Sequence, residues 1–83
     1  MTRSAALNKS QKWVELIRKC YPTGTRIECD GMEDIRAVRP GTRGTIVNVD
    51  DAGQIHVAWD NGSALALVPG IDHFHCVGGY AND

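Results

Sequence analysis

The stretch that most constrains the fold is residues 41–70, GTRGTIVNVDDAGQIHVAWDNGSALALVPG, because it combines short alternating segments with closely spaced turn residues. Within residues 45–50 and 55–60, branched or aromatic side chains alternate with polar or small ones. A period of two is typical of strands that bury one face. Asp, Asn and Gly residues at 50–53 and 60–62 supply turns after these segments. The stretch therefore predicts three antiparallel strands joined by two tight turns.

The second of these turns decides which side chains share a face. A two-residue turn at Asn61 and Gly62 would leave Leu65 and Leu67 on the solvent side. A three-residue loop over residues 60–62, with Gly62 left-handed, gathers the bulky side chains on one face instead. We therefore expect the three-residue loop, with the cross-strand pairs Trp59–Ser63, Val57–Leu65 and Ile55–Leu67. The opposite face then carries small, weakly polar side chains: His56, Ala58, Ala64 and Ala66.

Before this stretch, the sequence predicts one helix and one strand. Residues 1–7 have no pattern and are expected to be a mobile tail, and Asn8 or Ser10 can cap a helix over residues 8–20 that ends at Tyr21-Pro22. Its apolar face should cover the sheet and consists of Trp13, Leu16, Ile17 and Cys20. A first strand over residues 25–29 and a last strand over residues 73–77 should direct four side chains inward: Ile27, Cys29, Phe74 and Cys76. Between the first strand and Pro40 lies a long charged loop.

Four motifs in this order resemble a known family: YPxGTR at 21–26, PGTRGT at 40–45, GQIHVxWDNGS at 53–63 and LxPG at 67–70. The chain resembles, over residues 21–77, a small family of unknown function found mostly in phages and conjugative elements of Gram-positive bacteria. The resemblance implies a mobile genetic element and an SH3-like barrel, and it implies no activity. We therefore expect a mainly β protein, a small SH3-like barrel of about five antiparallel strands with one N-terminal α-helix. The whole chain should be one domain: a tail (1–7), a helix (8–20), the barrel (24–77) and a second tail (78–83).

Composition narrows the compartment and the chemistry. No apolar run approaches the roughly 20 residues of a membrane span, and residues 1–12 lack the apolar segment of a signal peptide. We therefore expect a protein of the host bacterial cytoplasm. Three cysteines, an odd number in a reducing compartment, indicate free thiols or metal ligands before disulfides.

Charge is divided unevenly along the chain. Residues 1–43 carry nine basic and five acidic residues, whereas residues 44–83 carry five acidic residues and no Lys or Arg. The resulting net charges of +4 and −5 favour an oriented encounter with a charged partner through acidic turns that lack compensating cations. Alternatively, aspartates simply collect where turns are. The expected partner-binding residues lie in these turns, on the flat face and in the long loop: Asp50, Asp51, Asp60, His56, Ala58, Arg36 and Arg39.

The densest cluster of reactive side chains is at residues 73–76, His-Phe-His-Cys. Two histidines two apart on a strand share a face and can give two ligands to one metal. The first and last strands are neighbours in an SH3-like barrel, so Glu28 and Asp30 can approach the histidines, while Cys29 and Cys76 meet on the inner side. Zinc suits such ligands, and the candidate set is His73, His75, Cys20, Cys29 and Cys76. In the alternative interpretation, the cysteines are core residues and the histidines are surface side chains.

The sequence offers no catalytic pattern, and we expect the protein not to be an enzyme. His75 and Cys76 point to opposite faces of a strand and cannot form a nucleophile–base pair. Residues 41–44, GTRG, lack the glycine spacing, lysine and helix of a P-loop.

Protein binding is therefore the expected function, with a host or element protein as the partner. For a mobile element, this favours a counter-defence inhibitor of the anti-CRISPR type that binds a host nuclease. One alternative is a nucleic-acid-associated regulatory module that uses the arginines around the long loop. The strands after Arg43, however, contain no Lys or Arg and would repel phosphate. The other is a zinc-stapled accessory domain. Membrane binding is not expected, and either a monomer or a homodimer is compatible with the sequence.

Overall fold

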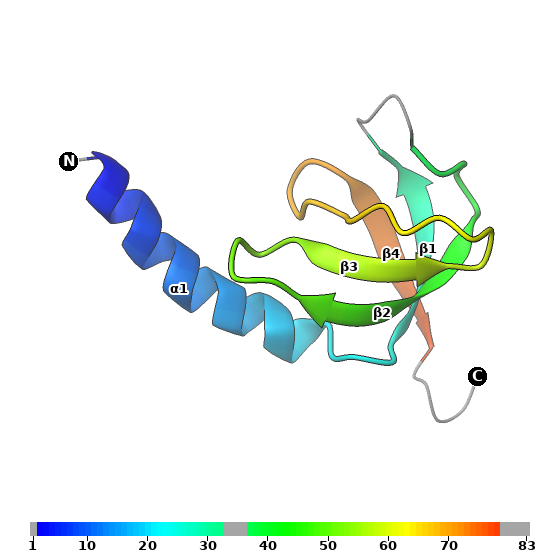
Figure 1. Ribbon diagram of the computed structural model, residues 1–83, viewed down its shortest axis with the longest axis horizontal. Helices are drawn as coiled ribbons and strands as arrows, with labels where there is room; N and C mark the ends of the chain where they lie inside the picture. The colour runs from blue at the N-terminus through cyan, green and yellow to red at the C-terminus, as the bar shows by residue number, and fades with distance from the viewer. Residues whose placement is uncertain (1, 33–36, 79–83) are drawn as a thin grey trace.

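The computed structural model describes residues 2–32 and 37–78 (Figure 1). The elements along the chain are α1 (Thr2–Cys20), β1 (Arg26–Gly31), β2 (Arg43–Val49), β3 (Ile55–Trp59) and β4 (His73–Gly78). The four strands form one antiparallel, open sheet in the order β3-β2-β1-β4. The mainly β fold with one N-terminal helix is confirmed, and the first and last strands are neighbours, as the resemblance implies. Arg36 and residues 79–83 lie outside the described residues.

The segment directly after β3 was expected to form a strand paired with β3. It lies beside β3 but does not form a regular strand. Its register is the predicted one, because the Trp59 N–H donates to Ser63 O at 3.0 Å and Ile55 bridges Leu67 through hydrogen bonds of 2.9 and 2.8 Å. Gly62 has a φ of 92°, as the three-residue loop requires. Both polar backbone groups of Leu65 are engaged elsewhere, since its carbonyl accepts the Trp59 indole N–H at 2.7 Å and its N–H donates to Ser63 Oγ at 3.3 Å. The ladder therefore cannot continue.

A β-bulge interrupts the alternation predicted for β2. The pairing of β2 with β3 shifts register between Ile46 and Asn48. Because a bulge adds one unpaired residue, Ile46 and Val49 are both buried although they are three positions apart. Val47 at the bulge is 50% exposed. The sheet surface thus gains an apolar side chain that alternation alone does not reveal.

The core lies between the curved sheet and the helix, and Trp59 is its largest side chain. Trp59 is 3% exposed and packs against Gly44 on the neighbouring strand. A Cβ atom at Gly44 would lie 2.6 Å from Val57 Cγ1 and 2.9 Å from Trp59 Cε3. Only glycine leaves room for this packing. The completely enclosed side chains around it are Ile27, Ile46, Ile55, Leu67 and Cys29.

Helix α1 begins earlier than expected. The tail predicted for residues 1–7 is wrong from Thr2 onward, because the helix already includes Thr2. Good helix formers, Ala-Ala-Leu at residues 5–7, allow the helix to extend past the polar residues that could have capped it. The helix ends at Cys20, before Tyr21-Pro22, as predicted. No helix among residues 2–32 and 37–78 is long and apolar enough to cross a bilayer.

The face that α1 presents to the sheet also differs from the prediction. Val14 and Ile17 are buried, whereas Leu16 is 57% exposed and Cys20 is exposed. The reason is the fit of Trp13, whose ring lies where a Cβ on Gly53 would be, 2.5 Å from Cζ3. Seating this large ring on the β2–β3 turn rotates the helix so that Val14, not Leu16, faces the core.

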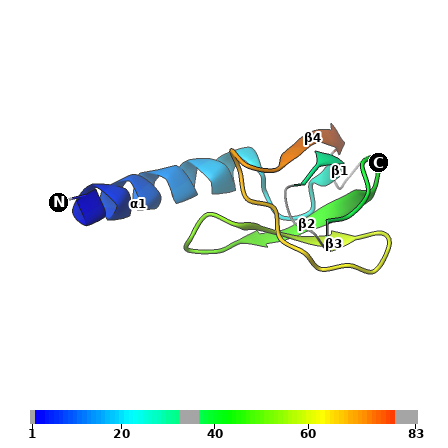
Figure 2. The ribbon, with the colours of Figure 1, turned by 90° about the horizontal axis from the view of Figure 1, so that it is seen from above.

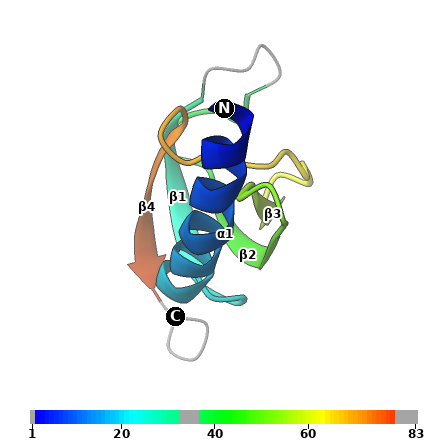
Figure 3. The ribbon, with the colours of Figure 1, turned by 90° about the vertical axis from the view of Figure 1, so that its left-hand side faces the viewer.

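A side-chain contact fastens the last part of α1 to the sheet. The Arg18 guanidinium donates to the Val49 carbonyl from Nε and Nη2, both at 3.1 Å, and to Asp51 Oδ1 at 3.1 Å. The N-terminal turns of α1 extend beyond the β2–β3 turn, away from the sheet (Figures 1 and 2). Viewed from the N-terminal end, the helix lies in front of the sheet (Figure 3). The described side-chain contacts of the helix with the sheet thus come from its second half.

We predict that Trp59→Ala lowers the free energy of unfolding by about 3–5 kcal/mol, because it removes the largest buried side chain and leaves a cavity. Urea unfolding followed by circular dichroism measures this. Trp59→Phe is the comparison variant, since it keeps a buried ring but loses the N–H donor to Leu65 and the volume of the second ring, so the loss should be smaller than for Trp59→Ala. A Trp59→Ala protein with the wild-type urea midpoint would show that Trp59 does not support the core.

Candidate functional site

The candidate site is a row of side chains on the outer face of the three strands β2, β1 and β4. Ile27 and Cys29 of β1 are buried, so the alternate residue Glu28 faces outward. Glu28 is opposite Arg43 on one side and His75 on the other. Arg43 Nε donates to Glu28 Oε1 at 3.0 Å. A carboxylate thus lies between a guanidinium and an imidazole, each from a different strand.

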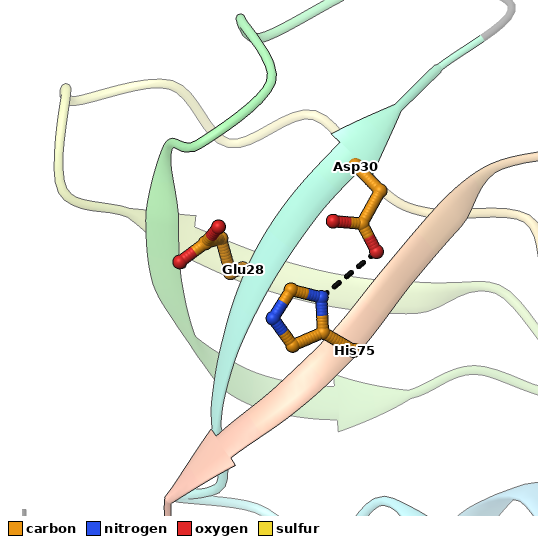
Figure 4. Close-up of side chains that lie close together, drawn as sticks. All are labelled: Glu28, Asp30 and His75. Carbon is orange, nitrogen blue, oxygen red and sulfur yellow. Dashed lines mark hydrogen bonds and ion pairs between the residues drawn. The ribbon is translucent and has the colours of Figure 1, made fainter.

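Asp30 completes this group from the end of β1. Its Oδ2 lies 2.8 Å from His75 Nδ1, and both side chains are about half exposed (Figure 4). The pKa of His75 is raised above its ordinary value of 6.5, chiefly by the hydrogen bond to Asp30, with further contributions from the charges of Asp30 and Glu28. Arg43 acts in the opposite direction. The imidazole is therefore held by its carboxylates in the protonated, donating form to a higher pH than a free histidine.

The same three side chains can hold a metal ion. One ligand atom each from Glu28, Asp30 and His75 lie within 4.8 Å of one another. Two carboxylate oxygens and one imidazole nitrogen are ligands that several divalent cations accept. A cation would have to displace the proton on His75 and compete with Arg43 for Glu28. The group can therefore exist in two forms. In one, His75 is protonated and Arg43 is bound to Glu28; in the other, the three side chains hold a metal ion.

The predicted ligand set is corrected by this geometry. His75, Glu28 and Asp30 come together as expected, but His73 does not join them. A register shift between Cys29 and Gly31 places His73 opposite Gly31, beyond the bulge and out of the row.

None of the three cysteines belongs to the metal-binding group among the described residues. Cys29 is fully buried on the other face of β1, where its Sγ donates to the Val38 carbonyl at 3.9 Å. The predicted meeting of Cys29 with Cys76 is wrong, because Cys29 is opposite Phe74 and Cys76 is opposite Ile27. Cys76 is exposed rather than inward, on the edge strand β4. Cys20 is exposed on α1.

The acidic turns predicted to meet a partner are already compensated by cations. Asp60 accepts two hydrogen bonds from Arg26, at 2.9 and 2.7 Å, and Asp51 pairs with Arg18 at 3.1 Å. The hydrogen bond from Arg26 lowers the pKa of Asp60. Both arginines come from the basic half of the sequence. The expectation of uncompensated acidic turns is therefore wrong, because the fold brings the two halves of opposite charge into contact.

Asp50 is also engaged. Its Oδ2 lies 2.8 Å from His56 Nε2, and its Oδ1 accepts the N–H groups of Ala52 and Gln54 at 3.0 and 2.9 Å. The His56 hydrogen bond is the largest cause of the lowered pKa of Asp50. Asp50 thus shapes the β2–β3 turn and holds His56 in place.

The flat face predicted around His56 is accessible. Ala58 and Ala64 are exposed, and His56 and Ala66 are half-buried. The same register joins Trp59 to Ser63 and Ile55 to Leu67, so Ala64 lies opposite Ala58. Val47, which the sequence pattern did not single out, is exposed on the adjacent strand. We refer to Val47, His56, Ala58, Ala64 and Ala66 as the alanine patch. Of the two loop arginines expected to bind a partner, Arg39 is exposed.

We predict that Asp30→Asn lowers the pKa of His75, because the substitution removes the largest cause of its elevation. NMR titration of the His75 ring measures this directly. A histidine with a raised folded-state pKa stabilises the fold below its unfolded-state pKa, and this contribution disappears as pH rises through the folded-state pKa. The stability advantage of wild type over Asp30→Asn should accordingly be largest below pH 6.5 and decline above it. An unchanged His75 titration would contradict the pairing.

Comparison with known proteins identifies a family. No curated protein and no solved structure matches the chain. A family model described as a domain of unknown function, DUF4314, matches residues 10–77. The match includes the second half of α1 and nearly all of the sheet, and it covers the residues that carry the resemblance noted in the sequence. The chain belongs to the DUF4314 family.

Proposed function

We propose that this protein is a non-enzymatic binding module that contacts a protein partner through the alanine patch. The observation that carries the proposal is an accessible and weakly polar area on a folded sheet, with Val47 half exposed and Ala58 and Ala64 exposed beside it. Small apolar side chains cost little to desolvate and let a partner approach the backbone closely. The buried centre of a protein–protein interface is more apolar than its rim.

The charged groups around the patch fit the role of a rim. The Asp50–His56 pair lies toward one end of β3, and the Asp60–Arg26 pair lies at the other. Preformed hydrogen bonds keep these polar groups satisfied when water is excluded, as the polar rim of an interface requires. Long-range steering by Asp60 is also weakened, because Arg26 already neutralises that carboxylate locally.

The cysteines support a non-enzymatic role. Burial raises the pKa of the Cys29 thiol and of the Cys76 thiol. The thiolate is the nucleophilic form, so both groups are poorly suited to nucleophilic catalysis.

Within this proposal, the partner is a protein of the host bacterium. The resemblance to a family of phages and conjugative elements makes counter-defence a suitable role, with a host nuclease as the first partner to test and an anti-CRISPR-type inhibitor as the specific form. Such a protein would act in the host cytoplasm.

We predict that Ala58→Arg abolishes partner capture without unfolding the protein, because a long charged side chain on an exposed strand position blocks close approach. Tagged wild type and variant are compared by affinity capture from host lysate treated with nuclease, followed by quantitative mass spectrometry. Ile71→Arg is the matched control, since it places the same side chain at another exposed apolar position outside the patch. Proteins that are captured by wild type and Ile71→Arg but not by Ala58→Arg support the proposal, and identical capture by all three contradicts it.

A second candidate function is zinc binding, favoured by the proximity of Glu28, Asp30 and His75. These residues join β1 to β4, which are far apart in sequence, so a bound ion would fasten the edge strand to the sheet. An imidazole nitrogen and two carboxylate oxygens are suitable zinc ligands. Zinc would then act as a structural staple on the fold that carries the alanine patch.

We predict that zinc raises the melting temperature of protein purified without a histidine tag, and that His75→Ala removes the increase. His73→Ala is the matched control, because His73 lies two residues away on the same strand but outside the group. The increase should shrink as pH falls, since zinc must displace the proton that the carboxylates hold on His75. Equal effects of the two substitutions, or no increase in wild type, would exclude this site.

A further inference from the structure

The charge asymmetry of this protein is between the helix and the rest of the chain. Helix α1 (Thr2–Cys20) contains five basic residues and one acidic residue, a net charge of +4. The remaining residues 21–83 carry a net charge of −5. The basic residues of the helix are Arg3, Lys9, Lys12, Arg18 and Lys19. The positive charge is thus concentrated on helix α1 and is not spread over the first half of the chain.

Not all of the helix cations are neutralised by ion pairs. Arg18, Arg26 and Arg43 each pair with a carboxylate. Among the residues whose side chains the structure describes, neither Lys12 nor Lys19 has an acidic partner within ion-pair distance, and both are exposed. They lie seven positions apart and therefore on one side of the helix, with Glu15 and the exposed Leu16 between them. The N-terminal turns extend away from the acidic sheet (Figures 1 and 2), so an anionic partner can reach this element without meeting the sheet.

The helix lacks the internal stabilisation that such a segment needs. Its first turn contains no acidic residue to complement the helix dipole. Before Glu15, the sequence has Arg3, Lys9 and Lys12 and no carboxylate, so ion pairs at i, i+4 cannot form there. An isolated helical segment of this length is marginal in water. Binding to an anion would remove the repulsion between its cations.

The composition of residues 2–12, TRSAALNKSQK, distinguishes among anionic partners. It has no aromatic residue and only one large aliphatic residue, Leu7. Protein hot spots and membrane-surface helices both depend on large apolar side chains. Phosphate contacts instead use Lys and Arg together with short polar side chains, which this segment has in Thr2, Ser4, Asn8, Ser10 and Gln11. A helix about 10–12 Å across also fits a DNA major groove about 12 Å wide.

We propose that α1 binds the phosphate backbone of duplex DNA without sequence specificity. This inference does not depend on the alanine patch or on a protein partner. It differs from nucleic-acid binding by the loop arginines, because Arg26 and Arg43 are held by carboxylates. A partner that itself handles nucleic acid would allow the sheet and the helix to bind at the same time.

The test measures fluorescence anisotropy of a labelled 20-base-pair duplex over a salt series. Lys12→Gln/Lys19→Gln removes two helix cations, and Arg36→Gln/Arg39→Gln removes the same charge from the long loop. Each lost phosphate contact lowers the slope of log affinity against log salt by about 0.9. We therefore expect a decrease of about two for the helix variant and no change for the loop variant.

Three outcomes would overturn the proposal. They are no DNA binding by wild type at 50 mM salt, an equal or larger loss in the loop variant, and preferential binding to poly-glutamate or to vesicles of anionic lipid. Thermal unfolding of each variant confirms that the fold is retained, since the substituted lysines are exposed. Ala58→Arg should bind DNA as wild type does. The DNA result and the protein-capture result can therefore fail independently.

Discussion

The packing of Trp59 against Gly44 is the contact on which the rest of the structure depends. The ring fills the space that any side chain at Gly44 would occupy, and so holds β2 and β3 at their distance. Its indole N–H binds the Leu65 carbonyl and draws the returning segment over the core. That bond also ends the β ladder, which leaves the sheet open after β3. The exposed face of this region, including Ala58 and Ala64, follows from one buried aromatic residue.

Electrostatic pairing is the second constraint. Arginines from the first half of the chain meet carboxylates of the strands and turns, as in Arg18–Asp51 and Arg26–Asp60. Both pairs are substantially exposed, so each contributes at most a modest stabilisation. They also neutralise Asp51 and Asp60 in the turns. The surface available to a charged partner is therefore different from the one that the order of charges along the chain indicates.

The group of Glu28, Asp30 and His75 illustrates how one site can serve two ligands. The carboxylates raise the pKa of His75 and so favour the proton, yet they supply the oxygen ligands that a metal ion needs. Arg43 competes for Glu28 from the neighbouring strand. Occupancy by a metal would thus depend on pH and on the release of this arginine. The site is therefore a candidate for a metal ion that links the first and last strands of the sheet and whose binding depends on pH.

The sequence by itself determined four of the five expected strand segments, the helix end before Tyr21-Pro22 and the three-residue loop with left-handed Gly62, because these depend on local backbone preferences and on which side chains must be buried. With the strand order that the family resemblance implies, the sequence also predicted that His75 lies beside the first strand. Only the tertiary structure decided that Val47 lies at a bulge and that Leu16 is exposed. It alone decided that His73 is left out of the metal-binding group. These outcomes depend on register shifts and on the fit of large rings between elements, which involve residues far apart in the chain and leave no local pattern.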